Sequence, residues 1–322
     1  MRNEAFTGRY KDHFEGFLIY KRSLGYRYGY SMIRDMIDLN EYLEAYSSGG
    51  IRITEEISHG YIAQKEYLSS GSIHRYESMI RQFSIYLRDT GYPDTYIYPE
   101  NHIKVTTDFI PYVFSRHEIA MIFRATDRLP EHKISPHNYK IFYQTIIRLL
   151  YGSGIRISEA LNLKTEEVDL DNNILTISDS KDNVSRLVPF NDDIAYWMKK
   201  YKSEHTDNLN YFFEFRKGKK RNKSSVSQQF KDTILADAGI PRKADNTGPR
   251  LHDLRHTFAC HSLDRMIKSG KDAYCALPYL STYMGHKGIE STEKYLRLTE
   301  EHFKEITEAG KYIYEGLSNE DE

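Results

Sequence analysis

The sequence LHDLRHTFACHSL, residues 251–263, predicts the start of a helix that extends over residues 251–268. His252 and Arg255 stand at positions i and i+3, so their side chains share one face of that helix. The simplest reading is that they are ordinary polar positions on a surface helix. His252 and His256, at i and i+4, also have the spacing of two zinc ligands, but no third ligand stands out. Other parts of the sequence are needed to decide whether these side chains have a structural or a catalytic role.

Three further stretches place polar residues where a buried core would prefer apolar ones. They are GSGIRISEALNL (152–163) with Arg156, the turn DSKDN (179–183) with Lys181, and MGHKGIESTEKYLRL (284–298) with His286 and Tyr295. Taken singly, each has a structural explanation. Arg156 can pair with Glu159, Lys181 can be a solvated turn residue, and Tyr295 can be half-buried packing. Taken together, these structural explanations would have to account for the order, the spacing and the residue types of four motifs at once.

Together the four stretches supply two arginines, a lysine, two histidines and a tyrosine, without a cluster of carboxylates. This set suits the transfer of a phosphodiester. Two guanidinium groups can hold the non-bridging oxygens, whose negative charge grows in the transition state. A tyrosine can be the nucleophile of a covalent intermediate, and neighbouring cations favour its phenolate. A lysine can return a proton to the leaving alkoxide, and this chemistry requires no metal ion.

Helical periodicity dominates the first hundred residues. It predicts four amphipathic helices, over residues 10–24, 31–46, 54–68 and 72–89. The third begins with TEEI, in which Thr54 is an N-cap followed by acidic residues in the first turn. Four such helices can form a compact bundle.

A linker is expected where the periodicity fails. Residues 92–114 contain three prolines and little helical period. Ser115 then opens a new helix with the capping-box sequence SRHE. We therefore place the first domain at 1–105, a linker at 106–114, the second domain at 115–300 and a C-terminal segment at 301–322.

The second domain mixes helices with a little β-structure. The segments NNILTIS and SRLVPF flank the DSKDN turn and predict a β-hairpin, and NYFFEF (210–215) suggests a further short strand. Helices are expected around them, among others over residues 192–201, 224–238, 273–284 and 289–298. The predicted fold class is mainly α with a small β-sheet (α+β).

Composition excludes several classes of protein. No run of about 18 apolar residues suggests a membrane span, and the N-terminus lacks the apolar core of a signal peptide. Cys260 and Cys275 show no metal-ligand spacing. These features fit a reducing cytoplasm.

The net charge of −1 conceals an asymmetry along the chain. Eight of the 46 acidic residues but only two of the 45 basic residues lie from Glu300 onward, so the rest of the chain carries +5. Six of the eight residues in RKGKKRNK (216–223) are basic. Such a run is either a solvated loop or a grip on phosphates, and charge alone does not choose between them.

The order of the motifs resembles that of the tyrosine recombinases, or phage integrase family, over roughly residues 112–300. That family carries an arginine in G-x-R-x-S-E-x-L, a β-hairpin lysine, H-x-x-R, G-H, and a tyrosine about nine residues later. Here the segments read GIRISEAL, SKDNVSRLVPF, LHDLRHTFACHSL, MGH and STEKYLRL. The helical first domain is similar to the family's core-binding (SAM-like) DNA-binding domain in arrangement rather than in motif.

The resemblance implies how the scissile phosphate would be held. Arg156 and Arg255 would clamp it, and His286 would hydrogen-bond a non-bridging oxygen. Glu159 matches an acidic position thought to support the arginine and histidine network.

The resemblance also implies how the strand would be cut and rejoined. Tyr295 would attack the phosphate and form a 3′-phosphotyrosyl link, His252 would act as base or proton shuttle, and Lys181 would protonate the departing 5′ oxygen. A free 5′-hydroxyl on another strand would reverse the reaction without ATP, metal or other cofactor.

The family fold implies duplex DNA with specific recombination sites as the partner. Two domains would close around the duplex, four protomers would assemble on two sites, and the C-terminal helix would dock on a neighbouring protomer. The alternative is that this helix packs on its own domain, and other recombinases are possible partners. DNA contacts are expected in the first domain and at Arg216, Lys217, Lys219, Lys220, Arg221 and Lys223.

The expected function is site-specific recombination for integration, excision or resolution of a DNA element, in the cytoplasm at the nucleoid. The chain begins close to the first helix, which favours a simple Xer or transposon-encoded type. A type IB topoisomerase shares the chemistry but relaxes supercoils as a monomer. A non-catalytic DNA-binding relative would show damage in the catalytic set, which is complete here, and a metal-dependent nuclease would be stopped by chelator.

Overall fold

The computed structural model describes residues 6–26, 28–46, 49–100, 110–131, 139–178, 185–204, 209–216, 218–240 and 248–285, together with Thr292 and Tyr295. The chain divides into two compact units, Met1–Phe109 and Ile110–Glu322. Each unit has its own hydrophobic core. The division falls inside the stretch where the sequence loses its helical period.

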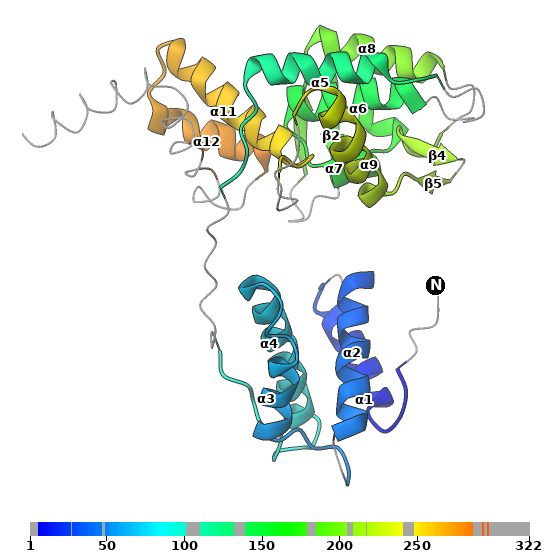
Figure 1. Cartoon of the computed structure of the whole chain (residues 1–322), viewed down its shortest axis with the longest axis vertical. Coiled ribbons are helices and arrows are strands. Elements are labelled where there is room, and N and C mark those ends of the chain that lie inside the picture. The colour runs from blue at the N-terminus through cyan, green and yellow to red at the C-terminus, as the bar shows by residue number, and fades with distance from the viewer. Residues whose placement is uncertain are drawn as a thin grey trace, which may run out of the picture. The chain divides into compact units, whose positions relative to one another are not determined.

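The first unit is a bundle of four helices, as the sequence predicts (Figure 1). They are α1 (Lys11–Ser23), α2 (Tyr30–Tyr46), α3 (Glu55–Ala63) and α4 (Ser70–Asp89). The Thr54 hydroxyl accepts a hydrogen bond from the Ile57 backbone N–H and caps α3. Phe14 of α1 stacks on Phe83 of α4 with ring centroids 4.0 Å apart, and such buried aromatic pairs hold the bundle together.

The second unit combines helices with two small antiparallel sheets, which confirms the predicted fold class. Its helices are α5 (Arg116–Arg128), α6 (Tyr139–Ser153), α7 (Ile157–Asn162), α8 (Asp192–Ser203), α9 (Lys223–Gln229), α10 (Leu235–Asp237), α11 (Asp253–Lys268) and α12 (Ala273–Met284). A 3₁₀ turn (Thr165–Glu167) follows α7, and a π-helical turn (Phe230–Ile234) joins α9 to α10.

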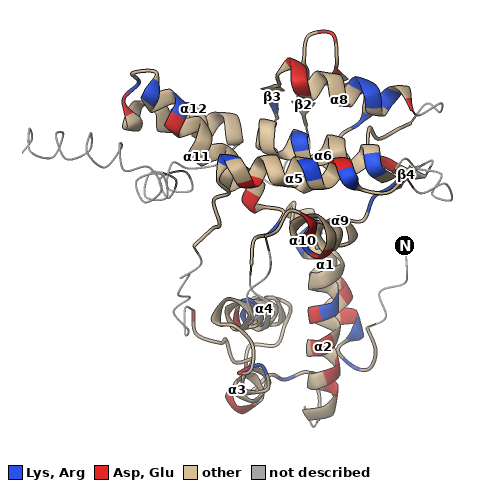
Figure 2. Ribbon diagram, turned by 45° about the horizontal axis from the view of Figure 1, so that its top comes forward, with Lys and Arg blue, Asp and Glu red and all other residues tan. Residues whose placement is uncertain are grey.

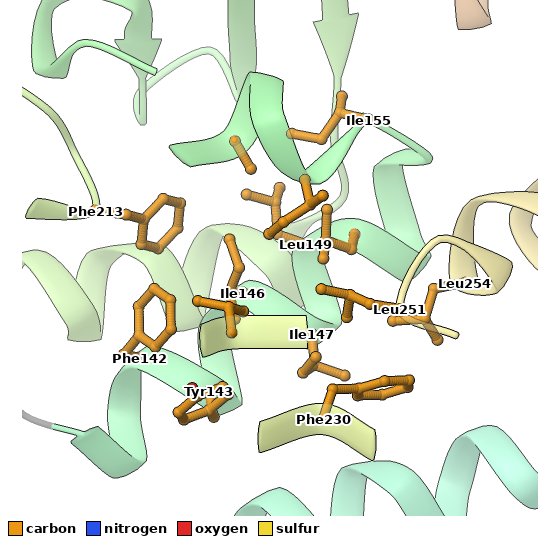
Figure 3. Close-up of a cluster of buried hydrophobic side chains, with 14 of the residues drawn as sticks. Phe142, Tyr143, Ile146, Ile147, Leu149, Ile155, Phe213, Phe230, Leu251 and Leu254 are labelled. Carbon is orange, nitrogen blue, oxygen red and sulfur yellow. The ribbon is translucent and has the colours of Figure 1, made fainter. Parts of the chain in front are cut away.

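Helix α6 is the centre of the second unit. Ten of its fifteen residues are buried, and a helix that is apolar around most of its circumference belongs inside a domain. Figure 3 shows side chains from other parts of the chain converging on α6, among them Ile155, Phe213 and Phe230. Leu251 and Leu254, at the start of α11, join the same cluster. The helix that carries Arg255 is therefore anchored in the main core at that end.

The first sheet has the strand order β1 (Val168–Asp169), β2 (Ile174–Ile177) and β3 (Arg186–Pro189). Strands β2 and β3 form the predicted hairpin, in which Leu175 is opposite Val188 and Ile177 is opposite Arg186. Because alternate residues of a strand face opposite sides, Arg186 shares the inner face with the buried Val188. Leu187, which is 63% exposed, faces outward.

The basic run 216–223 forms secondary structure rather than a plain loop. Strands β4 (Glu214–Arg216) and β5 (Lys219–Lys220) pair as a short antiparallel hairpin, and α9 begins directly after it. In Figure 2, positive and negative residues are interspersed over the helices of the second unit. Helix α8, for example, starts with two acidic residues and has lysines in its last turn, which suits the helix dipole.

Helix α11 is also fixed to the segment that enters the second unit. The Phe114 backbone N–H donates to Thr257 Oγ1 at 3.0 Å. A hydrogen bond of 3.0 Å joins Tyr151 Oη of α6 to His261 Nδ1. These contacts lie two and six residues beyond Arg255, so the orientation of that helix is fixed over its first half.

One helix is shorter than the sequence prediction, and another is described only in part. Helix α3 ends at Ala63 and continues as turns through residues 64–67, so the predicted helix over 54–68 was too long. The helix predicted over 289–298 lies mostly outside the described residues. Thr292 and Tyr295 are described there, and both have helical backbone.

His261 predicts a pH dependence for the second unit. Only 3% of its surface is exposed, and burial, aided by the charge of Arg116, lowers the pKa of His261 from 6.5 to about 4. The charge of Asp264 opposes this shift and that of Arg265 adds to it. Between those pH values the unfolded chain binds a proton at His261 that the folded chain does not. Stability therefore falls as the pH drops from 6.5 to about 4, by on the order of 3 kcal/mol.

Urea unfolding followed by the fluorescence of Trp197, the single tryptophan of the chain, measures this effect in the second unit. The control is His261→Gln, whose side chain keeps hydrogen-bonding atoms but does not titrate. We expect the stability difference between the two proteins to change across this pH window. Parallel pH profiles would contradict the assignment to His261.

Candidate active site

Arg255 is buried at the beginning of α11, with 3% of its surface exposed. Its Nη1 donates to the Gly154 carbonyl at 2.6 Å, and its Nη2 donates to the Met284 carbonyl at 2.7 Å. Burial lowers the pKa of Arg255 to about 10, and the charge of Arg156 adds to that effect. A buried cation is stabilised only by fixed acceptors, so these contacts hold the backbone as well as the arginine.

Arg156 is the N-cap residue of α7. Its Nη1 donates to Glu159 Oε1 at 2.9 Å, its backbone N–H donates to Glu159 Oε2 at 2.8 Å, and its Nη2 lies 3.5 Å from the Gly285 carbonyl oxygen. Gly154, two residues earlier, has φ +63°, and a Cβ there would overlap the ring of Phe258. Glycine is therefore required in the turn that presents Arg156.

The structure adds a third arginine that the sequence analysis did not select. Arg186 of β3 donates through Nη2 to Glu159 Oε2 at 2.9 Å and through Nη1 to Glu159 Oε1 at 3.2 Å. Its Nε donates to the Tyr283 carbonyl at 2.9 Å. The strand pattern contained a usable signal, because Arg186 is in phase with the inward Val188, where a residue without a function would be apolar.

The three arginines meet at the C-terminal end of α12. Gly285 ends that helix in the left-handed conformation, with φ +64°. Three consecutive carbonyls face a different arginine each: Tyr283 with Arg186, Met284 with Arg255, and Gly285 with Arg156. Carbonyls at a helix end lack partners within the helix and carry partial negative charge. The arginines supply both the missing hydrogen-bond donors and the opposite charge.

Glu159 is the carboxylate shared by two of these arginines. Burial alone would raise the pKa of Glu159, but hydrogen bonds from Arg186 and Arg156 outweigh it and hold the pKa below its ordinary value. The group therefore stays ionised and compensates part of the local positive charge.

Tyr295 is buried beside this cluster, with 1% of its surface exposed. Its Oη lies 3.0 Å from His256 Nδ1. Burial raises the pKa of Tyr295 above its ordinary value, while the charges of Arg255 and Arg156 act to lower it. The tyrosine selected from the sequence is thus close to both selected arginines.

The histidines of α11 form a short series that ends at Tyr295. His252 is exposed at the N-terminal end of α11, and its ring centroid is 4.9 Å from that of the buried His256. His256 in turn contacts the Tyr295 hydroxyl. The sequence analysis selected His252 and not His256, although the i, i+4 spacing that suggested a zinc pair already placed both rings on one face.

Three residues selected from the sequence lie outside the described residues: Lys181, His286 and Lys217. In the sequence, Lys181 lies between the segments that form β2 and β3, and His286 directly follows Gly285. The roles expected for these three side chains therefore stay predictions from the sequence.

The basic residues of 216–223 fall into two groups. Lys219 and Lys223 are exposed. Lys220 is exposed too, and its Nζ donates to Asn162 Oδ1 at 2.7 Å and lies 4.1 Å from the Tyr211 ring centroid. Arg216 forms part of β4.

Arg221 differs from its neighbours. Its guanidinium carbon lies 3.8 Å from the ring centroid of the buried Phe142, and burial lowers the pKa of Arg221. The side chain packs inward against an aromatic ring. The DNA contact expected for Arg221 stays a prediction from the sequence.

A polar hollow of about 480 Å³ adjoins Glu159. Its lining includes Lys164 and Lys220, the hydroxyl groups of Thr176 and Ser185, and the carboxylates of Glu159 and Glu167. Its walls supply hydroxyl and ammonium groups next to the arginine cluster.

The described part of the chain contains no group of three or more His, Cys, Asp or Glu side chains arranged to hold a metal ion. The two cysteines form no disulfide, since Cys260 is buried in α11 and Cys275 is exposed on α12. None of the helices within the described ranges is both long enough and apolar enough to cross a membrane.

The chain belongs to the phage integrase family, whose sequence profile matches residues 114–302. The integrase/recombinase y4rB of Sinorhizobium fredii is 29% identical over 296 residues, which cover 88% of this chain and 91% of that protein. The tyrosine recombinase XerA of Pyrococcus furiosus is 32% identical over 175 residues, or 54% of this chain and 56% of its own length. The chain is therefore a tyrosine recombinase, an enzyme class that transfers DNA strands.

Solved structures share the fold. XerH site-specific recombinase bound to palindromic difH substrate superimposes with a TM-score of 0.62 at 18% identity, covering 85% of this chain and 77% of that one. A λ integrase (75–356) dimer bound to a COC′ core site gives 0.58 at 14% identity, covering 87% and 94%. At these identities the likeness concerns the fold alone.

The contact between Tyr295 and His256 predicts an energetic coupling. Tyr295→Phe and His256→Phe should each destabilise the second unit, because each leaves a buried polar atom without its partner. The double variant should lose less than the sum, which gives a coupling energy of roughly 0.5–2 kcal/mol. Trp197 fluorescence in urea measures the four stabilities. The matched control pairs Tyr279→Phe, on the exposed side of α12, with His256→Phe, and additivity in the Tyr295 cycle would contradict the contact.

Proposed function

We propose that this recombinase cleaves and rejoins DNA through a 3′-phosphotyrosyl intermediate at Tyr295, without metal ion or ATP. The observation that carries the proposal is the convergence of Arg156 and Arg255 on adjacent carbonyls, Gly285 and Met284, beside Tyr295. Two guanidinium groups held on neighbouring carbonyls can bind two oxygens of one phosphate. Two fixed cations also oppose the charge that develops in the transition state.

In the cleavage step one bond to phosphorus forms and one breaks, the nucleophile loses a proton, and the leaving oxygen gains one. Tyr295 Oη attacks the phosphorus, the new O–P bond forms, and the bond from phosphorus to the 5′ oxygen breaks. The leaving oxygen takes a proton from Lys181, and His286 donates to a non-bridging oxygen. Rejoining reverses these steps with a 5′-hydroxyl of another strand. The number of phosphoester bonds is unchanged, so no ATP is needed.

The proton on the Tyr295 hydroxyl has a path to solvent. His256 accepts it at Nδ1, which lies 3.0 Å away, and the exposed His252 is next in the series. A histidine suits this role because its ordinary pKa is close to neutrality. Both histidines are therefore assigned to proton transfer, with His256 next to the nucleophile.

The described structure corresponds to a resting state under this proposal. With 1% of its surface exposed, Tyr295 cannot meet a phosphate of a bound duplex. Burial also raises its pKa, which disfavours the phenolate. Cleavage therefore requires that the Tyr295 hydroxyl become accessible to the phosphate when DNA binds.

Duplex DNA with specific recombination sites is the proposed partner. Similar structures are those of XerH bound to difH, λ integrase bound to a COC′ core site, and the Tn1549 integrase with transposon DNA. In this chain the exposed lysines Lys219, Lys220 and Lys223 are suited to phosphate contacts, and Arg216 and Lys217 belong to the same basic run of the sequence. The polar hollow beside Glu159 offers further groups for the backbone next to the scissile phosphate.

Covalent trapping tests the proposed chemistry. The protein is incubated in EDTA with nicked duplexes tiled from the DNA that flanks its own gene, and the products are separated on a denaturing gel. We expect a slow protein–DNA band with the wild type and with Tyr279→Phe, a tyrosine that is 70% exposed, and no band with Tyr295→Phe. A band that persists in Tyr295→Phe, or one that EDTA abolishes, would contradict the proposal.

The C-terminal segment is proposed to join protomers in a tetramer on two sites. Its apolar residues Phe303, Ile306 and Ile313 have helical spacing. Deletion of residues 301–322 should abolish assembly of two duplexes into one complex, as seen by light scattering, while binding to one duplex is kept. Deletion of residues 318–322 alone, which removes acidic residues but none of these apolar ones, is the control. An unchanged tetramer after the longer deletion would contradict the proposal.

A further inference from the structure

We infer that Tyr283 is a positioning residue of the active site, which holds the end of α12 at the point where the arginines converge. The inference rests on the proposed function, in which Arg156 and Arg255 bind the scissile phosphate. Tyr283 was not selected from the sequence, and the proposed chemistry gives it no part. Its contacts to three neighbouring elements define the role.

Tyr283 is bound to strand β3 at both ends of that strand. Its backbone carbonyl accepts a hydrogen bond from Arg186 Nε at 2.9 Å, and its hydroxyl donates to the Pro189 carbonyl at 3.2 Å. Arg186 and Pro189 are the first and last residues of β3. One residue of α12 therefore fixes the distance between the sheet and the end of that helix.

The ring of Tyr283 connects the same helix end to α11. It stacks on Phe258 with ring centroids 5.5 Å apart and an angle of 26° between the planes. Phe258 in turn covers Gly154, where a Cβ would overlap the Phe258 ring. The Gly154 carbonyl accepts a hydrogen bond from Arg255 Nη1. A continuous series of packed groups therefore leads from Tyr283 to the turn that holds Arg255 and presents Arg156.

Tyr283 also packs against two separate hydrophobic clusters. One is the main core around α6, and the other joins α11 to α12 and contains Tyr295. Among the partly buried apolar side chains of the described ranges, Tyr283 alone packs against both clusters. A leucine could fill the space, but it could neither stack on Phe258 nor donate to the Pro189 carbonyl. The contacts to β3 and α11 therefore explain why this position holds a tyrosine.

The Tyr283 hydroxyl remains a hydrogen-bond donor at neutral pH. Burial raises the pKa of Tyr283 to about 12, although the charges of Arg186 and Arg255 act to lower it. A phenol that keeps its proton can hold the Pro189 carbonyl. Tyr283 therefore acts through α12 and the arginines rather than on the phosphate.

A displacement of the α12 end would move three acceptors at once. The carbonyls of residues 283, 284 and 285 face Arg186, Arg255 and Arg156. Two guanidinium groups hold a phosphate only in a defined geometry, and a misplacement of about 1 Å at a reacting centre can cost about 100-fold in rate. The other contacts to the duplex would be kept, so the affinity for DNA should change little.

Single-turnover cleavage with protein in excess measures these two quantities separately. The substrate is the duplex identified by covalent trapping. In Tyr283→Leu the rate constant at saturation should fall by about 100-fold, while the protein concentration that gives half saturation should change by less than about 3-fold. Partial unfolding would act differently, because it lowers the fraction of active protein and leaves the rate constant of the folded fraction unchanged.

Three further variants calibrate the result. Tyr283→Phe keeps the ring and loses only the bond to Pro189, so its rate constant should fall by about 2- to 10-fold. It carries the test if Tyr283→Leu does not fold. Tyr279→Leu, four residues earlier on α12 and 70% exposed, should cleave at the wild-type rate. Met198→Ala, buried in α8, should lose stability in urea but keep the wild-type rate constant.

A double variant tests whether Tyr283 acts through the arginines. Arg255→Met alone should be slow, and adding Tyr283→Leu should cost less than about 3-fold more, because both changes disable the same group. Full additivity, or a wild-type rate constant in Tyr283→Leu, would overturn the inference. If Arg255→Met itself cleaves at the wild-type rate, the phosphate binding of the proposed function fails instead.

A measurement without DNA tests the contacts of Tyr283 directly. Amide hydrogen exchange in Tyr283→Leu should accelerate in β3 and at residues 283–285, with α8 unchanged. In Tyr279→Leu both regions should exchange as in the wild type. Unchanged exchange in β3 and at 283–285 in Tyr283→Leu would show that the inference is wrong, whether or not a cleavable duplex is found.

Discussion

The capping of one helix end by three arginines is the constraint on which the active site depends. Helix α12 stops at Gly285, and its last carbonyls accept hydrogen bonds from β3, α11 and the start of α7. Arg255 and Arg186 are buried, so neither can leave its acceptors without a large loss of free energy. Elements that are distant in sequence are therefore held to one point, and a displacement of α12 moves all three guanidinium groups together.

The charge of the cluster explains why this arrangement is ready for an anion. Glu159 touches two of the three guanidinium groups, those of Arg156 and Arg186. The remaining positive charge is only partly offset by backbone carbonyls. The proximity of Arg156 already affects Arg255, whose pKa is lowered first by burial and then by that charge. A phosphate placed among them would relieve this repulsion and would therefore bind most tightly when its own charge is greatest.

Local sequence determined what could be predicted. The helices of the first unit follow from periodicity and from caps such as Thr54, and the β-hairpin follows from alternation around a polar turn. Arg156, Arg255 and Tyr295 were found through motif spacing. Arg186 and His256 were missed because the partners that define them, Glu159 and Tyr295, are 27 and 39 residues away. The inward packing of Arg221 could not be predicted for the same reason, since a charge run does not reveal that one member turns toward Phe142.

The two cysteines make the end of α12 accessible to spectroscopy. Cys260 is fully buried, whereas Cys275 is exposed near the start of α12. A thiol-reactive dye will therefore couple at a single place in the unmodified chain. It will sit on the same helix whose far end contacts the arginines, separated from Gly285 by ten residues, or about 15 Å of helix. A change in its emission when duplex is added would report how that helix responds, in a protein that needs no engineered label.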